Sequence, residues 1–417
     1  MPHLNYSDSQ SIIITIWNKW IFYNKNGPMF SGRLLAEVFT WTFLEEAGIM
    51  IIGVPREIKN SENRVAMVPS GVKTLIQAGH QILIQKGAGL GSGILDQEYA
   101  STGAEIVSTN QDVFNKAEMI LKVKEPLPPE YSLLREGQIL FTFLHLAPLP
   151  DLTKALLKAK IVGIAYETIQ LEDRSLPLLT PMSEIAGRMS VHVGASLLHK
   201  ERGGSGVLLG GVPGVEAGKV VILGGGTVGT NAAKMAVGTG ASVSILDIDL
   251  NRLRYLDDIF GGRAHLVISN YYTIEKLVKE ADLVIGGVLV TGAKAPKLVT
   301  QETVSKMKKG SVIVDVAVDQ GGCIETCSPT NHENPTFVVD GVVHYCVANM
   351  PGAVARTSTF ALTNATFPYV LKIANLGYKE AMERDPTLMK GLNVHFGKLV
   401  CKPVADSQKV ECAAIEF

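Results

Sequence analysis

Four polar side chains of the 417-residue chain lie beside apolar, strand-like segments, and their types suit the binding of a small acid and the movement of a proton. Arg64 lies in a polar turn, Lys124 ends "LKVK", His145 ends "GQILFTFLH", and Asp319 follows "VDVAV". A guanidinium pairs with a carboxylate through two hydrogen bonds, an ammonium group adds a point charge, and an imidazole titrates near neutral pH. Because ligands of open α/β sheets bind at the carboxyl ends of strands, these residues predict a substrate site.

Each of these residues also fits a purely structural role. Arg64 and Lys124 could be solvated surface cations, and Asp319 could cap the end of its strand. His145 stands near the end of "GQILFTFLHLAPLP", and an apolar strand tolerates one imidazole that is hydrogen-bonded to a partner. The periodicity of this stretch does not identify that partner, so His145 is either a core residue or a proton carrier at this point.

A second chemical signature is the segment "KVVILGGGTVGTNAAKM", in which an apolar strand leads through Gly224, Gly226 and Gly229 into a helix. In this G-x-G-x-x-G pattern the first glycine allows a tight turn, the second lets backbone approach a pyrophosphate, and the third lets the helix pack on the strand. The N-terminus of the helix favours phosphate. The segment predicts a Rossmann-type dinucleotide site, and the alternative is an ordinary glycine-rich turn.

An acidic residue follows at the spacing that selects the ribose. Asp247 ends the next strand, 18 residues beyond Gly229. Its carboxylate can accept hydrogen bonds from a ribose 2′-hydroxyl and would repel a 2′-phosphate, which favours NAD over NADP. Arg252 weakens this preference because a nearby cation tolerates the phosphate.

Strand and helix patterns alternate from Met50 onward, which predicts a two-domain α/β protein with mainly parallel sheets. One long helix is expected within residues 178–205, with Ser183 at its start and Gly203–Gly204 at its end. Helical patterns return after the strand–helix block, which is typical of one domain inserted into another. We expect a Rossmann-type dinucleotide-binding domain at residues 181–354, inserted into a discontinuous α/β substrate domain at residues 50–180 and 355–417.

The composition is that of a globular chain without electrostatic bias. The formal net charge is −1 and 46% of the residues are hydrophobic, which argues against nucleic acid or an anionic membrane as the main partner. All five cysteines lie in the last quarter of the chain, and Cys323 and Cys327 are spaced like a metal pair. No second pair or histidine cluster completes four ligands, so we favour reduced thiols in a cytoplasmic protein without a metal site.

The first 49 residues differ from the rest of the chain. They hold all three tryptophans, and their apolar stretch at 11–23 is interrupted by Asn18 and Lys19. We expect no membrane span, because no apolar run reaches about 18 residues, and no signal peptide. We interpret residues 1–49 as an atypical extension and Met50 as the true start, with a targeting or docking arm as the alternative.

The motifs from Met50 to about Asp406 together resemble those of bacterial L-alanine dehydrogenases. The resemblance rests on segments that are far more specific as a set than the glycine motif: "GVPREIKNSENRVAMVP", "LKVKEPL", "GQILFTFLHLA", "AYETIQ", "LLTPMSEIAGRMS", "GVLLGGVPGV", "VILGGGTVG", "GAKAPKLVT", "VDVAVDQGGCIET", "YCVANMPGAVARTST" and "ALTNATFPYV". It implies reversible, NAD-dependent oxidative deamination of L-alanine to pyruvate and ammonia, and assembly as a homo-hexamer.

The resemblance also assigns roles by position. It implies that Arg64 and Lys124 contact the substrate, that Met182 lines the pocket, and that His145 is the general acid/base with Asp319 as its partner. The cofactor contacts that it implies are Ser183, Gly224, Gly226, Thr227, Val228, Gly229, Asp247, Arg252, Ser269, Val288, Leu289, Val316, Ala317, Val318, Asp319, Val347, Ala348, Asn349 and Met350. Some family members bind magnesium through an acidic residue and a histidine in a late helix, but "LKIANLGYKEAM" has no histidine, so no metal is expected.

These roles suggest a mechanism in which Arg64 and Lys124 orient alanine for hydride transfer. Water then attacks the iminium, His145 takes a proton from that water and later helps ammonia to leave, and Asp319 stabilises the cationic intermediate. With the resemblance included, the proton-carrier interpretation of His145 is favoured.

Two other functions share this scaffold. The NAD-binding subunit of a proton-translocating transhydrogenase has similar motifs, but such relatives typically lack the equivalents of Lys124 and His145 and work with membrane subunits. A catalytically silent NAD-binding regulator predicts the loss of at least one of the four catalytic candidates, and all four are present. An enzyme is therefore expected.

Overall fold

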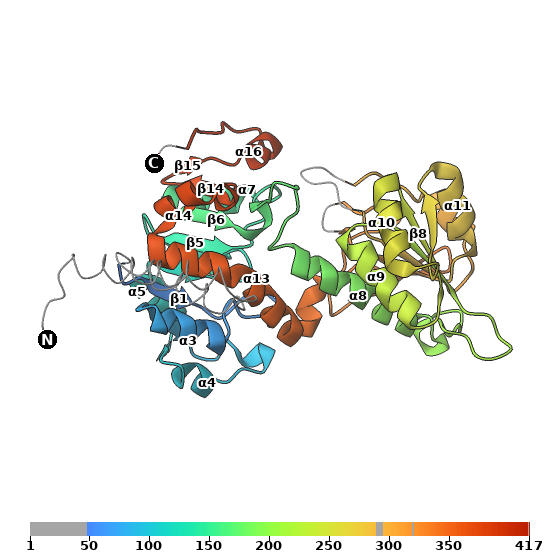
Figure 1. The fold of residues 1–417 in the computed structure, drawn as a ribbon, viewed down its shortest axis with the longest axis horizontal. Coiled ribbons are helices and arrows are strands. Elements are labelled where there is room, and N and C mark those ends of the chain that lie inside the picture. The colour runs from blue at the N-terminus through green and yellow to red at the C-terminus, as the bar shows by residue number, and fades with distance from the viewer. Residues whose placement is uncertain (1–47, 289–294, 319–320, 416) are drawn as a thin grey trace, which may run out of the picture. The chain divides into compact units, whose positions relative to one another are not determined.

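A computed structural model describes residues 48–288, 295–318, 321–415 and 417 of the chain. This part of the chain holds two α/β domains, each built around its own sheet, so the fold class predicted from the sequence is confirmed (Figure 1). The interpretation of the first residues, up to 47, lies outside the described residues, as do Leu289 and Asp319. Within the described ranges, no helix is long and apolar enough to cross a membrane.

The first sheet has eight strands in the order β15-β14-β6-β5-β4-β1-β2-β3, of which β1 to β6 are parallel and β14 and β15 are antiparallel. The strands are β1 Ile51–Val54, β2 Gln81–Gln85, β3 Glu105–Val107, β4 Met119–Leu121, β5 Ile139–Thr142, β6 Val162–Ala165, β14 Leu392–His395 and β15 Lys398–Leu399. Strands β4, β5 and β6 are buried along their whole length, because parallel sheets are covered on both faces.

Helices cover this sheet, and successive residues of a strand enter separate cores. Met119 and Leu121 belong to one apolar cluster and Ile120 to another, because side chains alternate across a strand. Figure 1 shows α13, whose Leu362 and Val370 pack in the first of these clusters, across the strands. The helices are α3 Pro69–Gln77, η1 Leu90–Ser92, α4 Asp96–Ala100, α5 Asn110–Lys116, α6 Pro128–Tyr131, α7 Pro150–Ala159, η2 Tyr166–Thr168, α13 Ala355–Leu376, α14 Tyr378–Arg384, α15 Pro386–Met389 and α16 Lys402–Gln408.

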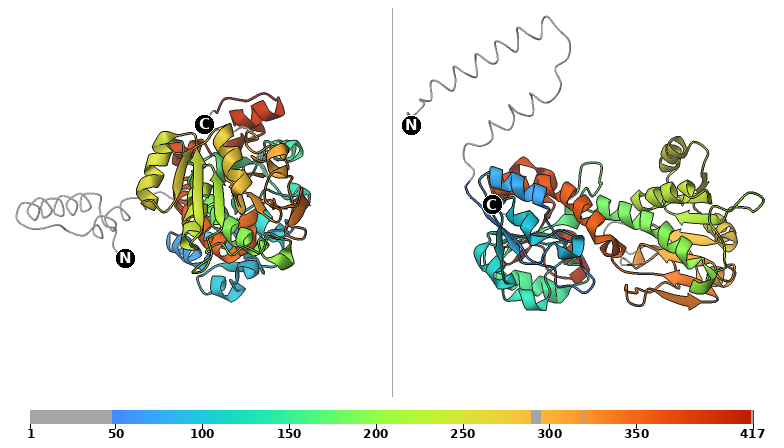
Figure 2. Two further views of the ribbon diagram at one scale, coloured as in Figure 1. Left: turned by 90° about the vertical axis from the view of Figure 1, so that its right-hand side faces the viewer. Right: turned by 90° about the horizontal axis from the view of Figure 1, so that it is seen from below.

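The second sheet has seven strands in the order β12-β13-β11-β10-β7-β8-β9, and all but β12 are parallel. The strands are β7 Lys219–Leu223, β8 Ser242–Asp247, β9 His265–Ile268, β10 Leu283–Gly286, β11 Val312–Asp315, β12 Thr336–Val339 and β13 Val342–Tyr345. Figure 2 shows these strands side by side, with helices on both sides. The accompanying helices are α8 Thr180–Leu197, η3 Lys200–Arg202, α9 Thr227–Gly238, α10 Leu250–Phe260, α11 Tyr271–Glu280, α12 Gln301–Ser305 and η5 Met350–Val354.

Both sheets are wound outwards from a central strand. In the second sheet β8 and β9 follow on one side of β7, while β10, β11 and β13 follow on the other. In the first sheet β1 separates β2 and β3 from β4, β5 and β6 in the same way. Ligands of open α/β sheets bind at the carboxyl ends of the strands beside such a reversal. A ligand site is therefore expected beside each reversal, which lies between β7 and β10 in the second sheet and between β1 and β4 in the first.

The helix that precedes the second sheet differs from the sequence prediction. Helix α8 begins at Thr180 rather than at Ser183. Pro181 suits the first helical turn, because N–H groups there have no partner within the helix and proline has no N–H. It ends at Leu197, well before Gly203. The intervening residues form η3, and Gly203 follows with a φ of 89°, which glycine adopts without strain.

Candidate active site

The glycine-rich turn follows β7, at the reversal of the second sheet. Gly224 has a φ of 93°, and a Cβ at this position would lie 3.0 Å from a methyl group of Val288. A Cβ at Gly229 would lie 1.8 Å from the carbonyl oxygen of Gly224, so α9 approaches the strand only because this residue is glycine. Gly226, the N-cap of α9, is open: a Cβ there would meet no atom within 4 Å. The N-terminus of α9 is thus free to receive a phosphate.

Asp247 and Arg252 both contact this turn. The carboxylate of Asp247 accepts hydrogen bonds from the N–H groups of Gly225 (2.7 Å) and Asp249 (2.9 Å). The guanidinium of Arg252 donates to the carbonyl oxygen of Gly225 (2.6 Å) and to the hydroxyl of Thr230 (2.7 Å). Arg252 is therefore engaged in holding the glycine turn, and the carboxylate of Asp247 lies directly beside that turn.

The other predicted cofactor residues that the structure describes lie mainly at the carboxyl edge of the same sheet. They are Thr227 and Val228 in α9, Ser269 after β9, Val288 after β10, Val316, Ala317 and Val318 after β11, and Val347, Ala348, Asn349 and Met350 after β13. Ser183 lies near the start of α8, which packs on α9 so closely that a Cβ at Gly187 would lie 2.2 Å from the carbonyl oxygen of Val228.

Arg64 is the centre of a buried hydrogen-bond network. It is 2% exposed, and its Nε donates to Oε1 of Glu62 (2.7 Å) while its Nη2 donates to Oε2 (2.5 Å). Nη2 also donates to Oδ1 of Asn349 (2.8 Å), and Nδ2 of Asn349 donates to Glu62 (3.1 Å). Nη1 lies 3.1 Å from the sulfur of Met182. The network joins three segments that are far apart in the sequence.

The electrostatics of this network leave one edge of Arg64 available. Burial opposes the ionisation of Glu62, but the hydrogen bonds and charge of Arg64 and the amide of Asn349 outweigh it and lower the pKa of Glu62. Glu62 is therefore charged and occupies the Nε–Nη2 edge of the guanidinium. A thioether is only a weak acceptor, so the Nη1 group beside Met182 is the part of Arg64 that can bind a substrate carboxylate.

Lys124 lies just after β4 and is 9% exposed. Its ammonium group makes no hydrogen bond or ion pair with any residue that the structure describes. Burial and the nearby charge of Arg64 lower the pKa of Lys124. Two cations in a buried space favour an anionic ligand between them, which fits the carboxylate of a small acid.

A buried ionic triad supports the backbone of Lys124. Lys122 pairs with Glu57 (3.0 Å) and Glu130 (2.9 Å), and all three side chains are buried. Burial opposes the charge of Lys122, but the two carboxylates outweigh it and raise the pKa of Lys122. The other oxygen of Glu57 accepts the N–H groups of Val123 (2.6 Å) and Lys124 (3.3 Å). Glu57 follows β1, so this contact spans the reversal of the first sheet.

His145 follows β5 in a left-handed conformation, with a φ of 48°. Its N–H donates to Oε1 of Glu167 (2.6 Å), and its ring stacks on Phe143 with the ring centroids 5.5 Å apart. The side chain is 38% exposed, and its ring makes no hydrogen bond with any residue in the described ranges. A core histidine would be buried and paired, so the geometry favours the proton carrier. Partial burial of the ring and the positive charges of Lys124, Lys59 and Arg64 lower the pKa of His145, which keeps the imidazole neutral.

The structure thus brings Arg64, Met182 and Asn349 into contact and places Lys124 and His145 within electrostatic reach of Arg64. Three carboxylates with no role predicted from the sequence, Glu62, Glu57 and Glu167, hold these residues in place. A signal for Glu167 was present, because it follows β6 as His145 follows the parallel neighbour β5.

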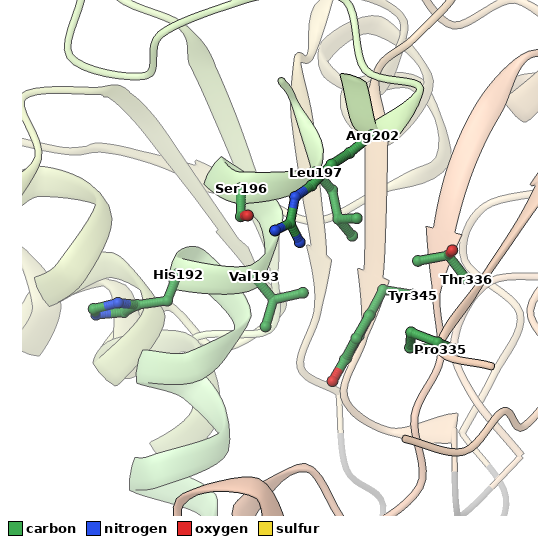
Figure 3. A pocket seen from close by; sticks show the side chains of 8 residues that line it. All are labelled: His192, Val193, Ser196, Leu197, Arg202, Pro335, Thr336 and Tyr345. Atoms are coloured by element: carbon green, nitrogen blue, oxygen red, sulfur yellow. The ribbon is translucent and has the colours of Figure 1, made fainter. Parts of the chain in front are cut away.

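No group of three or more His, Cys, Asp or Glu residues that could hold a metal occurs among the described residues, and Cys323 and Cys327 are free thiols. A cavity of about 290 Å³ lies beside α8 and the β12–β13 hairpin and contains none of the predicted site residues (Figure 3). It is lined by His192, Val193, Ser196, Leu197, Arg202, Pro335, Thr336 and Tyr345. Its walls are mostly carbon, and Figure 3 shows the His192 ring turned away from the other side chains.

Comparison with known proteins matches this architecture along most of the chain. Family models described as the N-terminal and C-terminal domains of alanine dehydrogenase/PNT match residues 53–186 and 190–402. The chain belongs to the alanine dehydrogenase/PNT family. Within it, an alanine dehydrogenase of Methanococcus maripaludis is 64% identical over 357 residues, which is 85% of this chain and 96% of that relative. Alanine dehydrogenase 2 of Staphylococcus aureus is 56% identical over 368 residues, which is 88% of this chain and 99% of that relative.

Solved structures of the alanine dehydrogenase/PNT family give the same result. An L-alanine dehydrogenase is 57% identical and superposes with a TM-score of 0.84, covering 86% of this chain and 99% of that one. A transhydrogenase from Sinorhizobium meliloti is 26% identical, with a TM-score of 0.74, and covers 84% of this chain and 100% of that one. Both branches share the fold, and the chain is much more similar in sequence to the alanine dehydrogenases.

Proposed function

We propose that this protein is an NAD-dependent L-alanine dehydrogenase, which converts L-alanine, water and NAD⁺ reversibly into pyruvate, ammonium, NADH and a proton. The observation that carries the proposal is the buried ammonium of Lys124, which has no hydrogen-bond or ion-pair partner among the described residues and lies within electrostatic reach of Arg64 and of the neutral imidazole of His145. This set can bind an amino-acid carboxylate and accept a proton. The identity of 56–64% to alanine dehydrogenases over most of the chain supports the same activity.

The cofactor part of the proposal rests on the fit of the glycine turn. The open backbone at Gly226 and the free N-terminus of α9 suit a pyrophosphate, which supports a nicotinamide dinucleotide. Asp247 suits a ribose with a free 2′-hydroxyl, so we propose NAD rather than NADP. When bound, NAD supplies the chemistry of accepting the hydride from the α-carbon of alanine.

The residues of the first domain then act on the substrate. Arg64, through Nη1, and Lys124 hold the carboxylate and so fix the direction of the α-hydrogen. After hydride loss, water attacks the iminium carbon, and the neutral imidazole of His145 removes a proton from that water. The protonated ring then gives this proton to the amino group, ammonia leaves, and the remaining hydroxyl proton is released as the carbonyl group of pyruvate forms. Asp319, which lies outside the described residues, is proposed as the partner of His145 from the family resemblance alone.

Several broader expectations belong to the same proposal. We propose the domain limits 181–354 for the cofactor domain, and 50–180 with 355–417 for the substrate domain. The strands support these limits, since the second sheet uses only residues 219–345. A homo-hexamer in the cytoplasm is proposed from the family resemblance, and sedimentation of the purified protein tests its assembly.

The decisive experiment is an assay of NADH oxidation with pyruvate, with and without ammonium, run in parallel with NADPH. Loss of NADH that depends on ammonium, with little loss of NADPH, is expected. Loss that is independent of ammonium would instead indicate a 2-keto acid reductase. Clear NADH binding without turnover would overturn the proposal in favour of a transhydrogenase subunit or a regulator.

A further inference from the structure

Asp315 is a buried carboxylate at the end of β11 for which the proposed mechanism has no use. Its side chain is fully buried and ends at the carboxyl edge of the cofactor sheet. Its oxygens accept hydrogen bonds from the N–H groups of Ala317 (3.0 Å), Cys323 (3.0 Å) and Ile324 (3.3 Å). One carboxylate therefore holds the backbone just after β11, at Ala317, and again at Cys323 and Ile324.

The space for this carboxylate is created by two glycines. A Cβ at Gly322 would lie 2.6 Å from Oδ2 of Asp315, and a Cβ at Gly286 would lie 2.9 Å from Oδ1. Gly322 also has a φ of 67°, which other residues adopt only with strain. The carboxylate of Asp315 fits closely against Gly286 and Gly322, so these neighbours determine where it lies.

A lysine ties a second segment to the same place. Nζ of Lys297 donates to the carbonyl oxygens of Gly321 (2.6 Å) and Ile324 (3.1 Å). The backbone adds to this tie, since the N–H groups of Leu298 and Val299 donate to the carbonyl oxygen of Cys323 (2.7 and 3.3 Å). Lys297 belongs to the motif "GAKAPKLVT", one of the segments that carry the family resemblance, but no role for Lys297 itself was predicted. Hydrogen bonds thus join the segment after β10 to the segment after β11.

We propose that Asp315 is a positioning residue for catalysis, which holds residues 316–318 and 321–324, and through them residues 297–299, in one arrangement at the edge of the cofactor sheet. The inference rests on the proposed function, because residues 316–319 are proposed to approach the nicotinamide. A neutral amide in place of the carboxylate would turn an NH₂ group towards backbone N–H groups and lose acceptors. Small errors in position at a hydride-transfer site reduce the rate strongly.

The test compares two isosteric substitutions in the same sheet. Asp315→Asn is expected to lower kcat for alanine oxidation about tenfold or more, while KM for alanine and the Kd for NADH change by less than about threefold. The control is Asp282→Asn at the opposite edge, where a buried carboxylate accepts the N–H of Lys219 (2.8 Å) and pairs with Lys308 (2.8 Å). Asp282→Asn should lower the melting temperature with little change in kcat.

Hydrogen exchange, measured by mass spectrometry on the full chain, provides a readout that does not need activity. Faster exchange in the peptide that covers 316–324 is expected for Asp315→Asn and not for Asp282→Asn. If Asp315→Asn does not fold, Lys297→Met removes the outer tie without burying a new polar group and should lower kcat in the same direction. Unchanged exchange, or a kcat loss equal to that of Asp282→Asn, overturns the inference. A wild-type protein without ammonium-dependent turnover overturns the proposed function instead.

Discussion

Oε1 of Glu167 accepts the backbone N–H of His145 at 2.6 Å and lies 3.8 Å from Nδ1 of the same residue. The two residues follow β6 and β5, which are parallel neighbours, so their strand ends meet at one edge of the sheet. Oε2 of Glu167 accepts the N–H of Leu144 as well (3.2 Å). The carboxylate therefore holds the turn in which His145 adopts its left-handed conformation, and so determines where the imidazole lies.

Replacing Glu167 should disturb this turn in proportion to the acceptors that are lost. Glu167→Ala leaves the N–H groups of Leu144 and His145 without their partners, which costs about 1–3 kcal/mol per buried group, and it should lower kcat because the ring is no longer held. Glu167→Gln retains one acceptor oxygen and should lie between the wild type and Glu167→Ala. Melting temperatures and kcat for alanine measure both effects. A folded Glu167→Ala protein with wild-type kcat would refute the positioning role.

His145 itself should be required for turnover and dispensable for binding the cofactor. His145→Ala is expected to lower kcat by about 10²–10⁴-fold, the usual contribution of a general base. The affinity for NADH, measured by fluorescence, should stay nearly constant because the glycine turn belongs to the other sheet. Since the pKa of His145 is lowered, the wild type should lose activity only on the acid side of the ordinary histidine range, and the variant should lack that acid limb. Equal turnover in the variant would show that His145 is not the general base.

The ionic triad predicts a large effect on stability. Lys122→Met leaves the carboxylates of Glu57 and Glu130 buried without a counter-charge, which should reduce the free energy of unfolding by about 3–5 kcal/mol. The matched control is Lys116→Met, which breaks an exposed pair with Glu105 and should change stability by less than about 1 kcal/mol. Urea unfolding measures both variants. An equal loss of stability in the two variants would show that the buried triad contributes no more than an exposed ion pair.

Local patterns predicted most of the fold. The apolar runs that became β4, β5 and β6 are buried on both faces, and the glycine spacing follows from close approaches that involve only neighbouring elements. Strands β3 and β9 give only a weak local signal, because they lie at sheet edges, where half-exposed residues carry no clear period. Strand β14 pairs with β6, which lies more than two hundred residues earlier in the sequence, and no local pattern predicts that pairing.

The site was predictable only in part, for a related reason. Residue type and strand ends indicated Arg64, Lys124 and His145. Their partners depend on tertiary contact: Asn349 meets Arg64 across 285 residues of sequence. Glu62 lies two residues before Arg64, yet the short spacing does not show that the two side chains pair. Charge pairing within a buried network becomes visible only once the strand ends are brought together.

The cofactor preference should depend on Asp247. Asp247→Ser removes the charge that repels a 2′-phosphate, while Arg252 stays on the same turn. The ratio of kcat/KM for NADPH to that for NADH should rise at least about tenfold, which is about 1.4 kcal/mol. Asp247→Asn is the control, because it keeps an acceptor for Gly225 without the charge. If neither variant changes the ratio, the 2′-position is recognised elsewhere.

The burial of Asp315 predicts that its contribution to stability decreases as the pH rises. Burial raises the pKa of Asp315 to about 6 from an ordinary value of 3.8, although hydrogen bonds from the N–H groups of Ala317, Ile324 and Cys323 oppose the rise. A raised pKa means that the folded state favours the protonated acid, so the contribution of Asp315 is full below about pH 3.8 and is lost as the pH rises through about 6. The change amounts to at most about 3 kcal/mol.

Subtracting the stability of Asp315→Asn from that of the wild type isolates this effect. Burial also raises the pKa values of Glu57 and Glu167, but both residues are present in both proteins and cancel in the difference. The difference should fall steadily as the pH of urea unfolding is raised from about 4 to about 7. A difference that stays constant would show that Asp315 titrates normally in the folded protein. A difference that grows with pH would show that the three backbone N–H groups outweigh burial and stabilise the charged carboxylate.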